Sequence, residues 1–95
     1  MHALFVTVSI DPAGMKEAQE TLSSQVVPAV KQSPGFVAGY WFAPQQKGGA
    51  LEGTSIVVYD SEANAKQGEQ MAKNSQRPAS VTFTGFDVRE VIASG

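Results

Sequence analysis

The order in which hydrophobic patterns follow one another constrains the fold of this chain more than any other feature. Alternating and helical patterns occur in the order strand, helix, strand, strand, helix, strand over 95 residues. That order is typical of a ferredoxin-like βαββαβ sandwich, in which a four-stranded antiparallel sheet carries two helices on one face. The sequence therefore predicts an α+β fold and a single domain over residues 1–95.

The first strand is expected at residues 2–10, where two kinds of side chain alternate. The aliphatic series is Leu4, Val6, Val8 and Ile10, and the mixed series is Ala3, Phe5, Thr7 and Ser9. We expect the aliphatic series to face the helices. The mixed series then faces the other side of the sheet.

A first helix is expected to start at Asp11-Pro12 and to end at Ser33-Pro34-Gly35. An Asp carboxylate can accept a hydrogen bond from an unpaired amide at a helix start, and Pro suits the first helical position. Pro28 lies late in this helix, lacks an N–H group, and should kink or loosen its final turns.

The remaining elements continue the same order. Strands are expected at 36–43, 53–59 and 81–92, a helix at 62–74 after the capping pair Asp60-Ser61, and a hairpin turn at Lys47-Gly48-Gly49. In the 53–59 strand, we assign Ile56 and Val58 to the helix-facing side. The opposite series, which includes Ser55, is assigned to the helix-free face.

A helix-free sheet face with many apolar side chains predicts a homodimer that packs sheet to sheet, because such faces are rare on monomers. We expect an interface of more than ~1,500 Å² in total. The residues expected on this face, and expected to bind a ligand in a cavity there, are Phe5, Thr7, Trp41, Ser55, Val57 and Tyr59. Tyr40 and Trp41 cannot both line one pocket, and we favour Trp41.

Composition excludes several classes of site. The net charge is −2 with scattered basic residues, which argues against nucleic-acid binding. There is no cysteine, His2 is the single histidine, and acidic residues show no metal-ligand spacing, so neither a metal site nor a metal cofactor is expected. The chain lacks an apolar run of membrane-spanning length and a signal-peptide pattern, so we expect a cytoplasmic protein with no membrane partner.

Three motifs carry a family resemblance that covers about residues 1–93. They are Pro12-Ala13-Gly14, Pro34-Gly35-Phe36 and Val57-Val58-Tyr59-Asp60-Ser61-Glu62. In their order and spacing the chain resembles the dimeric α+β barrel superfamily, and it is most similar to the branch named for antibiotic-biosynthesis monooxygenases. The resemblance implies a homodimer, but it does not fix an activity, since the superfamily includes monooxygenases, haem degraders and isomerases.

The resemblance can be tested at the positions that haem-degrading members use. Their strand Asn corresponds here to Thr7, their Trp to Tyr59, and their haem-ligating His to Gly68. Because glycine has no side chain to ligate iron, haem binding of that type is not expected. Cofactor-independent monooxygenases of the branch oxidise electron-rich aromatic molecules, and the resemblance therefore implies that no cofactor is needed.

Two classes of function remain open at this stage. The first is an enzyme that binds a planar small organic molecule and acts on it as a cofactor-independent oxygenase or as an isomerase, in which Tyr59 donates a hydrogen bond, Thr7 anchors a polar group and Trp41 provides a stacking wall. The second is a non-catalytic ligand-binding or purely structural dimer. In that alternative the Tyr59 hydroxyl is bonded to a neighbouring residue, His2 is solvated, and Arg89 and Glu90 form cross-strand or dimer ion pairs.

Overall fold

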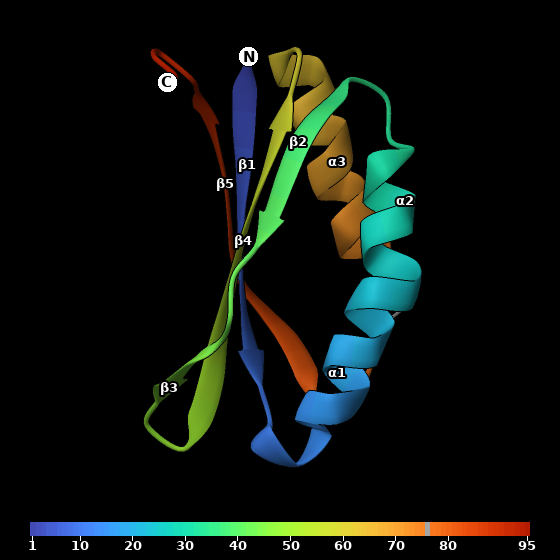
Figure 1. Cartoon of the computed structure of the whole chain (residues 1–95), viewed down its shortest axis with the longest axis vertical. Coiled ribbons are helices and arrows are strands. Elements are labelled where there is room, and N and C mark those ends of the chain that lie inside the picture. The colour runs from blue at the N-terminus through green and yellow to red at the C-terminus, as the bar shows by residue number, and fades with distance from the viewer. Residues whose placement is uncertain (76) are drawn as a thin grey trace.

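A computed structural model describes residues 1–75 and 77–95 of the chain. One antiparallel sheet contains β1 (His2–Ile10), β2 (Phe36–Trp41), β4 (Ala50–Tyr59) and β5 (Val81–Glu90) in the order β2-β4-β1-β5. The helices cover one face of this sheet and leave the other face uncovered (Figure 1). The predicted α+β, ferredoxin-like architecture is confirmed.

The hairpin between β2 and β4 differs from the expectation in one detail. A short fifth strand, β3 (Gln45–Lys47), pairs with the start of β4. The turn between them includes Gly48, which has a φ of 64°, a conformation that L side chains rarely adopt. The sheet therefore has five strands, because the residues just before the predicted turn pair with the residues just after it and form β3.

The first helical segment, Pro12–Lys31, is divided by a wider turn. It consists of η1 (Pro12–Gly14), α1 (Met15–Thr21), the π-helical η2 (Leu22–Val26) and α2 (Val27–Lys31). The Asp11 side chain accepts a hydrogen bond from the Ala13 amide, as predicted for a cap. The π turn directly precedes Pro28, whose missing N–H group interrupts the normal helical pattern. The loosening expected near this proline is thus confirmed.

The second helix, α3 (Glu62–Asn74), starts as the sequence predicts. The Ser61 hydroxyl accepts a hydrogen bond from the Asn64 amide, and the Asp60 carboxylate accepts one from the Asn64 side chain. Ala65 and Gly68 are the buried positions of α3. None of the described helices has the length and the apolar character that a membrane span requires.

The pairing register decides which side chains face the helices. In β1, Leu4 lies opposite Val57 of β4, so both project to the same side of the sheet. That side is the core, where Leu4, Val6, Val57, Tyr59 and Ala65 form one buried cluster. The predicted orientation of β1 is confirmed.

The predicted orientation of β4 is wrong. Ile56 lies opposite Phe5, and Val58 lies opposite Ala3, so both belong to the uncovered face. The register places Ser55, Val57 and Tyr59 on the helix side instead. Since side chains alternate with a period of two residues, a single wrong assignment exchanges the whole series.

Candidate functional site

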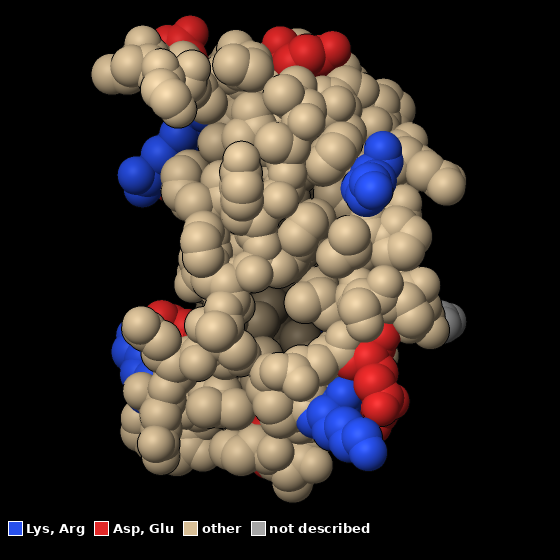
Figure 2. All heavy atoms as spheres, viewed as in Figure 1, with Lys and Arg blue, Asp and Glu red and all other residues tan. Residues whose placement is uncertain are grey.

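A cavity of about 570 Å³ lies between the sheet and the helices. Side chains from β1, β2, β4 and β5 line one wall, and residues of α1, η2, α2 and α3 line the other. Figure 2 shows a hollow on the molecular surface between the sheet and the first helical segment, bordered mainly by uncharged residues. The volume is within the usual range for sites that bind small organic molecules.

The structure divides the six predicted ligand-binding residues between two faces of the sheet. Four of them, Trp41, Ser55, Val57 and Tyr59, line the cavity on the helix side. Phe5 and Thr7 do not line it and project from the uncovered face. The predicted grouping of all six on the helix-free face is therefore wrong, because it depended on the incorrect orientation of β4.

Trp41 lines the β2 edge of the cavity, and Tyr40 does not, as we expected from the sequence. Its ring packs along its own strand, where the absence of a side chain at Gly39 leaves room for the indole. Tyr40 projects to the other side of β2 and is 57% exposed. Trp41 can therefore contact a ligand, although from the helix side of the sheet.

Tyr59 is buried, and its hydroxyl is bonded within the protein. It lies 3.1 Å from the Ser33 hydroxyl, which in turn lies 2.5 Å from the Val30 carbonyl oxygen. A carbonyl can only accept, so the single Ser33 proton is directed to Val30 and the Tyr59 hydroxyl donates to Ser33. The phenol therefore has no proton left for a ligand, as expected in the non-catalytic alternative.

Gly68 lies directly against the Tyr59 ring. A Cβ atom at position 68 would overlap the hydroxyl oxygen and ring carbons of Tyr59. The glycine therefore permits close contact between α3 and β4. It also means that the Tyr59 ring occupies the space that a side chain at position 68 would need, which is the position of the ligating histidine in haem-degrading proteins.

Thr7 has a different environment from Tyr59. Its hydroxyl lies 3.1 Å from the Thr84 hydroxyl, on the uncovered side of the sheet. Because a β-sheet separates Thr7 from the cavity, Thr7 and Tyr59 cannot contact one ligand molecule within a single chain. The predicted catalytic pair is not brought together.

His2 and Arg89, the other candidate residues, each lie beside a carboxylate. The His2 side chain is only 20% exposed, and its Nε2 lies 3.8 Å from a Glu62 carboxylate oxygen, so the expectation of a solvated histidine is wrong. Arg89 pairs with Asp87 on its own strand and lies over the Phe5 ring. This is an ion pair along β5, rather than the cross-strand or dimer pair that we expected for Arg89.

Two residues of the site were not identified from the sequence. From the sequence, Ser33 was identified only as part of the helix end, and no role was assigned to Arg77. Both line the cavity. No local sequence signal indicates this, since each reaches the cavity through the packing of distant segments.

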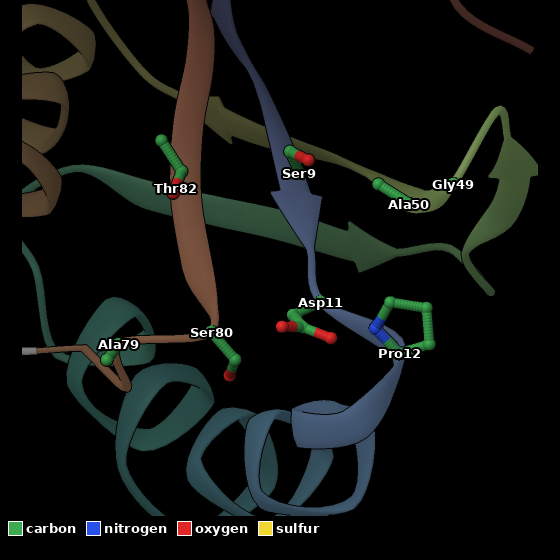
Figure 3. A pocket seen from close by; sticks show the side chains of 8 residues that line it. All are labelled: Ser9, Asp11, Pro12, Gly49, Ala50, Ala79, Ser80 and Thr82. Atoms are coloured by element: carbon green, nitrogen blue, oxygen red, sulfur yellow. The ribbon is translucent and has the colours of Figure 1, made fainter.

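A second hollow, of about 350 Å³, lies beside the start of the first helical segment (Figure 3). Hydroxyl groups of Ser9, Ser80 and Thr82 and the Asp11 carboxylate are found around it. The Asp11 side chain already caps the helix, and the Ser80 hydroxyl points towards the helical turns at Gly14. The cap accounts for the single charged group of this hollow, and the larger, mainly apolar cavity is the candidate site.

Comparisons with known proteins support the fold. Two dimeric ferredoxin-like proteins from an uncultured marine organism match with a TM-score of 0.62 each, at 9% and 16% identity. The first match covers 100% of this chain and 98% of the other, and the second covers 99% and 97%. A haem-degrading protein from Mycobacterium tuberculosis, solved free of haem, matches with a TM-score of 0.53 and 20% identity, over 100% and 99% of the two chains. No protein-family model and no curated protein matches the chain.

Proposed function

We propose that this protein is a homodimer that binds a small, weakly polar organic molecule in the cavity between its sheet and helices. The observation that carries the proposal is the cavity of about 570 Å³, whose walls are mainly apolar side chains. Native cores are normally packed with few voids larger than a water molecule. A space of this size that opens to the surface is therefore better explained as a binding site than as imperfect packing.

The homodimer is proposed from the uncovered sheet face. Phe5 and Ile56 lie opposite each other on it, with Val58 and Tyr40 close by in the register. A second copy packed face to face would remove these side chains from water, which is favourable by about 25 cal/mol per Å² of apolar surface. Two proteins of similar fold are described as dimeric, which supports the same assembly here.

The hydrogen bonds of the site favour a binding protein over a cofactor-independent oxygenase. An enzyme that oxidises a phenol without a cofactor requires groups that exchange protons with the substrate. The Tyr59 hydroxyl donates to Ser33, and Thr7 lies on the other face of the sheet. We therefore propose a binding protein related to the antibiotic-biosynthesis-monooxygenase-like branch, in which Trp41 contacts the ligand and the phenol of Tyr59 is structural.

Filling the cavity should abolish binding. In Ser55→Phe, the new ring would occupy the space beside Trp41, because both positions line the cavity. We expect 2-naphthol to quench the fluorescence of Trp41, the single tryptophan, and expect Ser55→Phe to weaken binding at least tenfold by calorimetry. Gln70→Phe introduces the same ring on the exposed side of α3, outside the cavity and the proposed dimer face, and should leave binding unchanged. Equal binding to both variants would contradict the proposed site.

Haemin should not bind through an axial histidine. Gly68 is covered by the Tyr59 ring, and His2, the single histidine, does not line the cavity. Titration with haemin should therefore give no Soret band characteristic of histidine-ligated iron. If such a band appeared and disappeared in His2→Ala, iron ligation by His2 would have to replace this prediction.

A further inference from the structure

The cavity has a fixed charge at one end. Arg77, on the segment between α3 and β5, is the only charged residue among the described residues that line it. Trp41 lines the cavity from β2, at the other edge of the sheet. Because β2 and β5 both contribute to the lining and are separated by three inter-strand spacings, the cavity extends ~14 Å across the sheet.

The guanidinium group of Arg77 is held in place but is not neutralised. Its central carbon lies 4.4 Å from the centroid of the Phe83 ring, and one of its nitrogens donates to the Ser75 carbonyl at 3.4 Å. Within residues 1–75 and 77–95, the structure pairs it with no carboxylate, whereas Arg89 pairs with Asp87. A guanidinium group has five N–H donors, so one that lies over an aromatic ring and donates to a single carbonyl keeps others available to bind an anion.

The walls between the two ends are mainly aliphatic. Val6, Val8 and Ile10 line the cavity from the sheet, and Leu22 and Val26 line it from the helices. The other polar side chains that line it are neutral, such as Gln19 and Gln25. A ligand that satisfies the whole site therefore needs a long apolar body and a single negative charge at the Arg77 end.

We propose that the cavity binds an aliphatic monocarboxylic acid. Its carboxylate forms a paired hydrogen bond with the Arg77 guanidinium, and its hydrocarbon chain crosses the sheet towards Trp41. This inference rests on the proposed function, since it names the chemical class of the molecule that the cavity binds. It also corrects the expectation from the sequence, which assigned no charged group to the site.

The proposal can be tested with decanoate and its uncharged counterpart 1-decanol, both below the concentrations at which they aggregate. Binding to the full chain is measured by calorimetry and by Trp41 fluorescence. We expect decanoate to bind about tenfold or more tightly than 1-decanol, because a hydrogen bond to a charged group is stronger than one to a neutral group. Shortening decanoate to octanoate should weaken binding by up to about 15-fold, since two methylene groups are lost from the apolar wall.

Two variants separate the charge of Arg77 from other effects. Arg77→Gln should weaken decanoate binding about tenfold or more and leave 1-decanol binding unchanged. Lys73→Gln removes a nearby positive charge that pairs with Glu69 and does not line the cavity, so it should affect neither probe. As a measurement that needs no variant, added salt should weaken binding of decanoate but not of 1-decanol.

The possible results distinguish this inference from the proposed function. If decanoate and 1-decanol bound equally and Arg77→Gln changed the affinity of neither, the ligand would not be a carboxylic acid. Binding of a small organic molecule in the cavity would still be supported. If 2-naphthoate bound more tightly than decanoate, the inference that the hydrocarbon part of the ligand is aliphatic would be wrong. If Ser55→Phe left decanoate binding intact, the acid would bind outside the cavity and this inference would fail.

Discussion

Replacing Tyr59 by alanine should lower the free energy of unfolding by about 3–5 kcal/mol. The side chain is 2% exposed and packs against Gly68 of α3. Its removal would leave a void that adds to the existing cavity and would also remove the hydrogen bond between the Tyr59 and Ser33 hydroxyls. Because small domains have only about 5–15 kcal/mol of stability in total, urea unfolding should show a large decrease in midpoint.

Two further variants identify the origin of the effect. Gln70→Ala truncates a side chain that is exposed on α3, away from the uncovered sheet face, and should change stability by no more than about 0.5 kcal/mol. Tyr59→Phe retains the ring and loses only the hydrogen bond to Ser33, which should cost about 1 kcal/mol. Equal losses in Tyr59→Ala and Gln70→Ala would contradict the central position of Tyr59 in the core.

Introducing a charge at position 56 should dissociate the proposed homodimer. Ile56 lies opposite Phe5 on the uncovered face, so Ile56→Glu would place two buried carboxylates in a two-fold interface. Burying an unpaired charge costs several kcal/mol, and we therefore expect dimerisation to weaken about 100-fold or more. Light scattering at micromolar concentration should give twice the chain mass for the original protein and the single-chain mass for the variant.

The control for this experiment adds the same charge to the helix layer. Gln70 lies exposed on α3, so Gln70→Glu should leave the dimer intact. Circular dichroism should show that Ile56→Glu remains folded, because the residue lies outside the buried cluster. A protein that is monomeric before any substitution would exclude the sheet-to-sheet dimer.

The local features of this chain could be predicted because neighbouring residues determine them. Asp11 and Ser61 cap helices through amides two and three residues later, and Pro28 disturbs the helix through its own missing N–H group. In β1, one series is wholly aliphatic and the other contains Thr7 and Ser9, so the pattern itself indicates the core side. None of these predictions requires contacts between distant segments.

The orientation of β4 could not be obtained in the same way. Thr54, Ile56 and Val58 form one series and Ser55, Val57 and Tyr59 form the other, and the two have nearly the same polarity. When both series can be buried, the alternation indicates a strand but does not show which series faces the core. The pairing of Leu4 with Val57 decides it, and that pairing joins segments more than fifty residues apart.

Short-range patterns were enough to predict the order of the elements, the ferredoxin-like fold, the helix caps and the core side of β1. The packing of distant segments set the position of the proposed ligand site. It brought Trp41 from β2 and Arg77 from the segment before β5 to the same cavity, and it separated Thr7 from Tyr59 by placing them on opposite faces of the sheet. Strand register and helix docking depend on long-range packing, and no single segment of the chain contains that information.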